Sequence, residues 1–371
     1  MKVLMVSGDR AYFDEKSAVR KRAVAYGSVL TELHIIVTTT QSMGFSRTKL
    51  ADNIWLYPTN SAFKALMWLD AIFLGRGLPP TELVTSQDPF ELGLASYAIA
   101  NDHSARLQLQ IHTDFMSPHY RRQGVVQSIR VRIARYLIPK ADCVRVVSER
   151  IRTSLAGMTL RKEPHVLPVY TDMQHFLSDE PLFSLHTKYP QFNFIVLMMS
   201  RLTKEKDIQT GMRAFKILLE KDTRAGLCIV GDGEEMGALK KYAHELGIEN
   251  SVVFAGWQQD TLSYLKSADV FLNTSLYEGY ALTLVEAAAT KRPIVTTNVG
   301  VAGELLMNHR HALIAPVGGV KELGSHLVAL MADNTLRERI AVNAHEEVLA
   351  SATISFEDYL ERMKNSFSSC F

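Results

Sequence analysis

Residues 193–200 have the sequence NFIVLMMS and run directly into a charged segment at 201–207. This run is apolar along its whole length instead of at alternate positions, which is typical of a parallel strand covered on both faces. Four similar runs follow, separated by helical patterns: GLCIVG at 226–231, VVFAG at 252–256, VFLNT at 270–274 and PIVTT at 293–297. The second half of the chain is therefore predicted to form a doubly wound α/β sheet.

The first half repeats the same alternation of apolar runs and helical patterns. Its runs are KVLMVS at 2–7, LHIIVT at 33–38, NIWLYP at 53–58, ELVTS at 82–86, LQLQIH at 107–112 and CVRVVS at 143–148. We therefore expect two doubly wound, Rossmann-like domains that face each other across a cleft. Ligands of open α/β sheets bind at the carboxyl ends of the strands, so the functional residues are expected in the loops that follow the strands.

Prolines and polar residues interrupt this rhythm between the two halves, at Pro168, Pro181 and Pro190. We expect an N-terminal domain at 1–168, a linker at 169–190 and a C-terminal domain at 191–353. The last stretch, 354–371, has helical spacing of apolar residues and no strand after it. This helix is expected to complete the N-terminal domain.

Length and composition fit this division. The chain has 371 residues, of which 47% are hydrophobic and 22% charged, which excludes a disordered or fibrous protein and favours two domains. Three cysteines lie far apart, so we expect neither a disulfide framework nor a metal site, and a reducing, cytoplasmic compartment. No signal-peptide core and no membrane-spanning stretch is present.

Two motifs of the second half suit a phosphate-bearing ligand. Arg201 and Lys206 follow the first strand and precede a helix, where charge and free backbone N–H groups can hold a pyrophosphate. A solvated charge cluster would show the same pattern. Gly231, in the segment GDG at 231–233, marks a tight turn after the next strand, and alone it is a weak signal.

The sharpest signal is the segment SLYEGYALTLVEA at 275–287. Glu278 lies in the loop before a predicted helix, and residues 279–283 present consecutive N–H groups at the helix N-terminus. Glu286 lies about one turn inside that helix, where its carboxylate can accept hydrogen bonds from two ribose hydroxyls. Glu286 stands in an apolar run and would need a partner, which argues against a merely solvated helix residue.

These motifs, together with the following KRPIVTTNVGVAGELL, resemble the donor-binding half of the retaining glycosyltransferases of family 4 (glycosyl transferases group 1). That family has the GT-B fold. The resemblance implies that Arg201 and Lys206 neutralise the diphosphate of a nucleotide sugar, that Glu286 binds the ribose and that Glu278 approaches the transferred sugar. The family usually has Phe-Gly where this chain has Tyr280-Ala281, so the fit around the sugar differs.

In the first half, the segments SQDPFELG at 86–93 and QIHTDFMSP at 110–118 resemble strand ends of the same family's acceptor domain. His112 ends a strand there, where the family's matching histidine lies beside the transferred sugar. A structural histidine is the alternative. The resemblance thus implies catalytic roles for His112 and Glu278. The implied donor-binding residues are Gly8, Ser200, Arg201, Lys206, Gly231, Glu278, Gly279, Tyr280, Ala281, Leu282, Thr283 and Glu286.

The two halves differ in charge. Residues 1–170 carry 22 basic and 14 acidic side chains, a net +8, and residues 171–371 carry 19 and 25, a net −6. The segment 121–140 contains no acid but six basic residues beside apolar positions with helical spacing. It is predicted to be either a core-packed helix with solvated arginines or a surface that docks on an anionic membrane. No nucleic-acid-reading module accompanies these arginines, so no nucleic acid partner is expected.

The implied chemistry is transfer of a sugar from a nucleotide-diphosphate sugar, UDP- or GDP-linked, to a glycan or lipid-linked acceptor with retention of configuration. No cluster has convincing metal-ligand spacing, so we expect no metal and no further cofactor. A non-catalytic sugar-nucleotide-binding protein remains an alternative. A two-domain oxidoreductase is disfavoured because SGDRAYFDEK at 7–16 lacks GxGxxG. The predicted location is cytoplasmic, with peripheral attachment to the inner membrane face left open, as are the sugar, the linkage and the oligomeric state.

Overall fold

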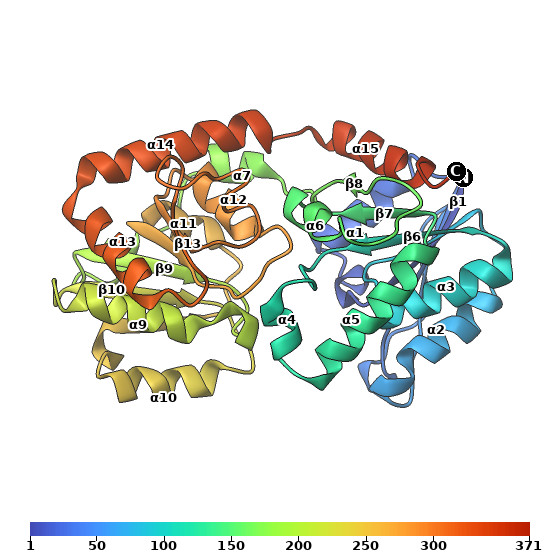
Figure 1. Cartoon of the computed structure of the whole chain (residues 1–371), viewed down its shortest axis with the longest axis horizontal. Coiled ribbons are helices and arrows are strands. Elements are labelled where there is room, and N and C mark those ends of the chain that lie inside the picture. The colour runs from blue at the N-terminus through green and yellow to red at the C-terminus, as the bar shows by residue number, and fades with distance from the viewer. The chain divides into compact units, whose positions relative to one another are not determined.

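The computed structural model describes residues 1–371 and divides into two compact units, each built on its own sheet (Figure 1). The first unit contains Met1–Tyr170 and Ile354–Phe371, and the second contains Thr171–Thr353. Both sheets are doubly wound, as the uniformly apolar runs predict. The predicted α/β class is therefore confirmed.

The first unit has an eight-stranded sheet in the order β3-β4-β2-β1-β5-β6-β7-β8. All neighbours are parallel except β3, which pairs antiparallel with β4 at one edge. The strands are β1 Lys2–Ser7, β2 Glu32–Val37, β3 Thr48–Ala51, β4 Ile54–Pro58, β5 Leu83–Ser86, β6 Arg106–Ile111, β7 Cys143–Val146 and β8 His165–Val166. The helices are α1 Ala18–Tyr26, α2 Met67–Arg76, α3 Glu91–His103, α4 Pro118–Arg122, α5 Val125–Leu137, α6 Glu149–Ser154 and α15 Phe356–Ser368.

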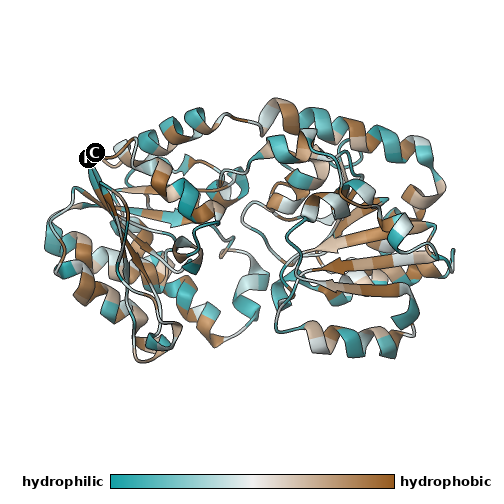
Figure 2. Cartoon of the chain, turned by 180° about the vertical axis from the view of Figure 1, so that it is seen from behind, coloured by the Kyte–Doolittle hydropathy of each residue, from teal (hydrophilic) through white to brown (hydrophobic).

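The second unit has a fully parallel, six-stranded sheet in the order β11-β10-β9-β12-β13-β14. Its strands are hydrophobic along most of their length (Figure 2), and two buried clusters cover the two faces of the sheet. The strands are β9 Phe194–Met199, β10 Ala225–Val230, β11 Val252–Gly256, β12 Val270–Asn273, β13 Ile294–Thr297 and β14 Leu313–Ala315. The helices are α7 Met173–Ser178, α8 Leu185–Lys188, α9 Ile208–Leu219, α10 Met236–Leu246, α11 Thr261–Ser267, α12 Leu282–Ala289, α13 Val320–Ala332 and α14 Asn334–Ser351.

Most of the stretch expected as a linker lies within the second unit. Residues 171–190 contain α7 and α8, and their buried side chains Phe176 and Leu185 join the same hydrophobic cluster as α12. Prolines in this stretch end short helices rather than leaving an extended connection. At the other end of the chain, α15 packs on the first unit through Tyr359, Met363 and Phe367.

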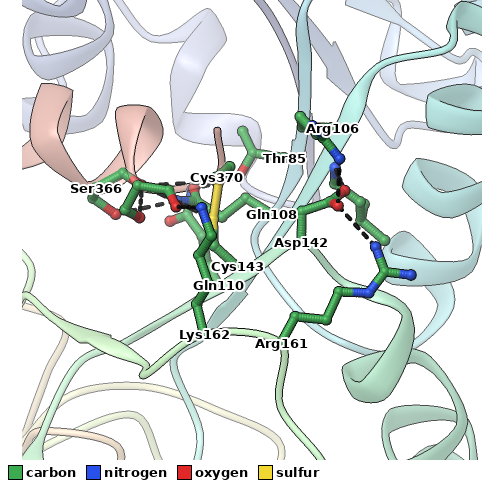
Figure 3. Close-up of a disulfide and its surroundings, with 12 residues drawn as sticks. Thr85, Arg106, Gln108, Gln110, Asp142, Cys143, Arg161, Lys162, Ser366 and Cys370 are labelled. Atoms are coloured by element: carbon green, nitrogen blue, oxygen red, sulfur yellow. Dashed lines mark hydrogen bonds and ion pairs between the residues drawn. A yellow bond between two sulfur atoms is a disulfide. The ribbon is translucent and has the colours of Figure 1, made fainter.

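The expectation that the cysteines form no disulfide is wrong for one pair. Cys143 in β7 is bonded to Cys370, which follows α15, across 227 residues of sequence (Figure 3). Sequence spacing could not indicate this pairing, because it depends on the return of the last helix to the first sheet. Cys228 is free and buried. The argument for a reducing compartment from cysteine usage therefore no longer holds.

The helix predicted in the segment 121–140 exists as α5, which buries Val131, Ala134 and Leu137 on one face but leaves other apolar side chains exposed. Val125 is 76% exposed, and Val126, Ile129 and Tyr136 are each about half exposed, whereas Leu137 is buried. Among the basic residues of this segment, Arg130 forms an ion pair: its Nε lies 2.9 Å from a carboxylate oxygen of Glu91. No helix of the structure is long and apolar enough to cross a membrane.

Candidate functional site

The strand order of the second unit brings two loops together. β9 lies between β10 and β12: the chain adds β10 and β11 on one side of β9 and then crosses to the other side, where it adds β12, β13 and β14. Such a reversal of strand order opens a crevice at the carboxyl ends of the strands, where open α/β sheets bind their ligands. The loop after β9 carries Arg201 and Lys206, and the loop after β12 carries Glu278.

Hydrogen bonds hold these two loops against each other. The Thr274 hydroxyl donates to the backbone carbonyls of Lys206 and Asp207 at 3.1 and 2.9 Å. The Leu276 N–H donates to the Glu205 carbonyl at 2.8 Å. The loops are therefore one structural unit, although about 70 residues separate them in sequence.

Lys206 and Glu278 face each other within this unit. The Lys206 Nζ lies 2.5 Å from Glu278 Oε1, and both side chains are only about 15% exposed. The Ser275 hydroxyl donates to the same oxygen at 2.7 Å. The Glu278 carboxylate thus holds the Lys206 ammonium in place between the two loops.

Arg201 takes a different position from Lys206. Its side chain is 77% exposed, and its guanidinium lies 3.7 Å from Glu205, a loose ion pair across one turn. Ser200, just before it, donates through its hydroxyl to the Arg201 carbonyl. The loop after β9 therefore carries one largely buried cation, Lys206, and one exposed cation, Arg201.

Gly231 supports this loop through its backbone. Its φ is +135°, and a Cβ at this position would collide with the Ser200 carbonyl oxygen. Only glycine allows the turns after β9 and β10 to approach so closely. The structure thus gives Gly231 a packing role in shaping the loop that carries Ser200 and Arg201.

The N-terminus of α12 directly follows the loop that carries Glu278. The helix begins at Leu282, so Gly279, Tyr280 and Ala281 belong to the preceding loop. The N–H groups of Leu282 and Thr283 lie in the first turn, where an α-helix offers no internal acceptor. Ala281 has φ +69°, a left-handed conformation that costs a residue with a side chain roughly 1–2 kcal/mol. The helix start therefore offers donors and a positive dipole end to an anion.

Glu286 is the fifth residue of α12, and its carboxyl has no hydrogen-bonded partner in the protein. Burial raises the pKa of its carboxyl to about 7, and only the nearby His175 acts in the opposite direction. A buried carboxyl without a partner is costly unless a ligand supplies one. This is the arrangement that a carboxylate needs to accept hydrogen bonds from two ribose hydroxyls.

The predicted residues of the first half lie around a cavity of about 290 Å³ in the first unit. The cavity lies at the carboxyl ends of β1, β5 and β6 and is closed on one side by α15. Gly8 is exposed in the loop after β1, next to Asp9 of the cavity wall. The lining residues are Met5, Asp9, Tyr12, Val19, Arg22, Tyr26, Gln87, Gln110, His112, Arg145, Val169, Tyr359 and Met363.

Hydrogen bonds determine the state of His112. The Arg145 guanidinium can only donate hydrogen bonds, so the Gln110 side chain must turn its oxygen towards Arg145 Nη1, at 2.7 Å. The Gln110 amide nitrogen then donates to the Thr85 hydroxyl at 2.9 Å. The His112 Nε2 lies 3.3 Å from the Gln110 oxygen and must carry the proton. Burial, with Arg145 and Arg22 nearby, lowers the pKa of His112 to about 3. His112 is therefore neutral, with Nδ1 free to accept a hydrogen bond, and it is a poor proton carrier at neutral pH.

Arg22, Gln110 and Arg145 were not singled out from the sequence. The signal for Arg145 was present, because it is the one charged residue in the otherwise apolar run CVRVVS at 143–148. Arg22 lies in a helix with other basic residues and gives no such signal. No group of three or more His, Cys, Asp or Glu side chains that could hold a metal ion occurs in the structure.

Comparison with solved structures defines the fold. The chain aligns over 100% of its length with all of Anabaena Alr3699/HepE, solved in complex with UDP-glucose, at a TM-score of 0.77 and 19% identity. It aligns over 99% of its length with 98% of a sucrose-phosphate synthase from Thermosynechococcus elongatus, at a TM-score of 0.81 and 15% identity. With its two Rossmann-like units, the chain has the GT-B fold of these neighbours.

The sequence comparisons find a family resemblance in the second half of the chain. Residues 187–347 match the family model described as glycosyl transferases group 1. This segment, which lies within the second unit, is therefore similar to the glycosyl transferases group 1 family.

Two curated relatives illustrate the match. The chain is 29% identical over 227 residues to alpha-monoglucosyldiacylglycerol synthase of Streptococcus pneumoniae, which covers 58% of this chain and 51% of that protein. It is 31% identical over 209 residues to the lipopolysaccharide core biosynthesis glycosyltransferase LpsE of Rhizobium meliloti, which covers 56% and 59%. The chain spans about half the length of the curated relatives it matches.

Proposed function

We propose that this protein is a retaining glycosyltransferase of family 4. It moves a sugar from a nucleoside-diphosphate sugar to a hydroxyl of a glycan or lipid-linked acceptor, in polysaccharide or glycolipid synthesis. The observation that carries the proposal is the junction of the loops after β9 and β12 with the start of α12 in the second unit. There Lys206, the free N–H groups of α12 and the unpartnered Glu286 combine a diphosphate site with a ribose site.

In this proposal the donor diphosphate competes with Glu278 for Lys206. The Lys206 ammonium has three N–H donors. It can therefore donate to a phosphate oxygen either together with Glu278 or in its place. Charge that develops on the leaving diphosphate is then stabilised by Lys206, by the exposed Arg201 and by the helix N-terminus. Groups that are already oriented need little reorganisation during the reaction.

Retention of configuration follows if the acceptor hydroxyl attacks from the side of the departing diphosphate, which takes the hydroxyl proton. Glu278 acts in this scheme as a positioning residue, because Lys206 and Ser275 already occupy one of its oxygens. His112 positions a hydroxyl through Nδ1 rather than removing a proton. Neither residue needs to form a covalent intermediate.

The proposal includes turnover without a metal ion or an additional cofactor, since Lys206, Arg201 and the helix N-terminus supply positive charge at the leaving group. Among the donors, UDP-sugars are the first to test, because the Anabaena neighbour is described in complex with UDP and with UDP-glucose. GDP-sugars remain the second choice from the sequence.

A lipid-linked acceptor would also place the first unit beside a membrane. The apolar residues exposed on α5 support this extension of the proposal, together with Arg121, Arg122, Arg132 and Arg135, which are exposed and carry no ion pair. Apolar side chains bordered by arginines are typical of helices that lie on anionic bilayers. The opposite face of α5, with Val131, Ala134 and Leu137, is buried in the first unit and leaves this apolar face available.

The experiment that tests the function has two stages. Thermal unfolding with a panel of UDP-, GDP- and ADP-sugars identifies the donor, since a ligand at 100 times its dissociation constant adds roughly 2.7 kcal/mol of stability. Incubation with that donor and candidate acceptors, followed by NMR of the anomeric proton, then reports transfer and configuration. Product with the donor's configuration supports the proposal. An inverted product contradicts retention, and binding without any transfer or hydrolysis indicates a non-catalytic binding protein.

A further inference from the structure

A buried arginine stands in the sheet of the first unit without an acidic partner. Arg145 lies in the middle of β7, and only 3% of it is exposed. Its Nε and Nη2 donate to the Leu167 carbonyl at 3.1 and 2.9 Å, and Nη2 also donates to the Pro168 carbonyl at 3.1 Å. Its Nη1 donates to the Gln110 side chain at 2.7 Å. All of these acceptors are neutral.

Neutral acceptors satisfy the donors of Arg145 but leave its charge uncompensated. Removing a charge from water is expensive unless an opposite charge takes the place of the solvent. An apolar residue would fit the run CVRVVS better, since the other positions of β7 are buried too. The structure thus keeps a costly cation at a place where the protein supplies no anion.

A second arginine lines the same cavity. Arg22, on α1, is half-buried, and its Nη1 donates a long hydrogen bond to the Tyr170 carbonyl, at 3.5 Å. Most of its N–H donors are therefore available. Arg22 forms no ion pair with any carboxylate of the chain.

The cavity wall contains one acid, Asp9, against these two cations. The Asp9 carboxylate already accepts the Ala11 N–H at 3.0 Å and caps the short helix after β1. His112 adds no charge, since both arginines act with burial to keep it neutral. The lining of this cavity of about 290 Å³ therefore carries a net positive charge.

We propose that this cavity of the first unit binds an oxyanion, a carboxylate or a phosphate group of the acceptor, with Arg22 as its direct ligand and Arg145 as the buried counter-charge. The guanidinium of Arg22 offers the forked donors that match either oxyanion. The bound group would lie beside His112, whose free Nδ1 can then orient an acceptor hydroxyl. That the bound group belongs to the acceptor rests on the proposed function. That the cavity binds an anion rests on the charges of its lining alone.

Three sugars that differ only in charge test this site on the full-length protein: glucose, glucuronate and glucose 6-phosphate. We expect calorimetric titration to show at least tenfold tighter binding of one anionic sugar than of glucose. The change Arg22→Gln should weaken that binding at least fivefold. Lys21→Gln removes the same charge from the neighbouring, exposed residue of α1 and should leave the binding unchanged. Arg22 is preferred to Arg145 for the test because its loss leaves no cavity in the sheet.

A fourth probe separates two sources of the anion. Dihexanoyl phosphatidate, used below its micelle concentration, presents the phosphate on a lipid, and tighter binding of this probe than of glucose 6-phosphate would assign the group to a lipid headgroup. The reverse order would assign it to a soluble acceptor. Equal binding of glucose and all anionic probes, or anion binding that Arg22→Gln leaves intact, would overturn the inference. UDP affinity measured on the same samples reports on the second unit, so failure of this site and failure of the proposed function remain distinguishable.

Discussion

Lys206 and Glu278 form a close ion pair, with Nζ 2.5 Å from Oε1, between loops that follow β9 and β12. Each residue was expected to contact a different part of the donor. Their contact holds the Lys206 ammonium in place between the two loops. It also links the stability of the two loops to the residues that would bind the donor.

Breaking this pair on one side should destabilise the second unit. Lys206→Ala leaves the Glu278 carboxylate partly buried with only the Ser275 hydroxyl as a partner, and we expect the free energy of unfolding to fall by about 2 kcal/mol. Lys206→Met combined with Glu278→Gln removes both charges and should cost clearly less. Urea unfolding of the three proteins checks this. Equal losses in the single and double variants would show that the pair contributes no coupling.

The raised pKa of Glu286 predicts a pH-dependent ribose site. At about pH 7 the carboxyl changes from the neutral form, which accepts poorly, to the carboxylate, which accepts from both hydroxyls. The loss of UDP affinity caused by Glu286→Gln should therefore grow between pH 6 and pH 8. Calorimetry of both proteins at each pH measures this difference and cancels the titration of UDP itself. A difference that stays constant over this range would contradict the ribose assignment.

The same shift makes a prediction about stability without ligand. The folded pKa lies above the unfolded one, so the neutral carboxyl contributes stability that is present below about pH 4.5 and is lost as the pH rises through about 7. Relative to Glu286→Gln, the melting temperature of the wild type should decline between pH 5 and pH 8. A wild type that gains on the variant over this range would show that the carboxylate is stabilised by a partner.

Vesicle binding should depend on the exposed arginines of the segment 121–140. We expect co-sedimentation with anionic but not with neutral vesicles, and weaker binding as salt shortens the Debye length from about 10 Å at 0.1 M towards 3 Å at 1 M. Changing Arg121, Arg122, Arg132 and Arg135 to Gln should abolish it. Arg130→Gln is the matched control, because Arg130 already pairs with Glu91. Equal, negligible binding to both vesicle types would make a soluble acceptor the better interpretation.

The disulfide between Cys143 and Cys370 should stabilise the packing of α15 on the first sheet. Disulfides that close long loops typically contribute about 2–4 kcal/mol, so Cys370→Ser should lower the free energy of unfolding by that amount. Under reducing conditions the wild type and this variant should become similar. Thiol alkylation of protein unfolded without reductant should label Cys228 alone, and labelling of all three cysteines would contradict the bond.

The sequence was sufficient for the fold class but not for the contacts within each site. Continuous apolar runs such as NFIVLMMS identify parallel strands, because few other structures bury both faces of a short segment. The spacing of α5 predicted a helix correctly, yet helical spacing does not tell which face is covered, and Val125 and Val126 proved to be exposed.

The contacts depend on the order of strands in space. Lys206 meets Glu278 only because β9 and β12 are neighbours, and nothing in the residues between them specifies that order. Likewise Cys370 reaches Cys143 only because α15 returns to the first unit. Arg145 is different, because a charged residue inside an apolar strand can be recognised from the sequence alone.

The most direct test of the account is calorimetric titration of UDP, GDP and ADP into the full-length wild type and into Arg201→Ala combined with Lys206→Ala. We expect one nucleotide to bind the wild type, and the double variant to lose on the order of 2–3 kcal/mol of binding free energy, because charge-assisted contacts to the diphosphate are missing. Lys204→Ala removes an exposed cation from the same loop and should bind like the wild type. A folded double variant that binds the nucleotide as tightly as the wild type would contradict the assignment of the donor site.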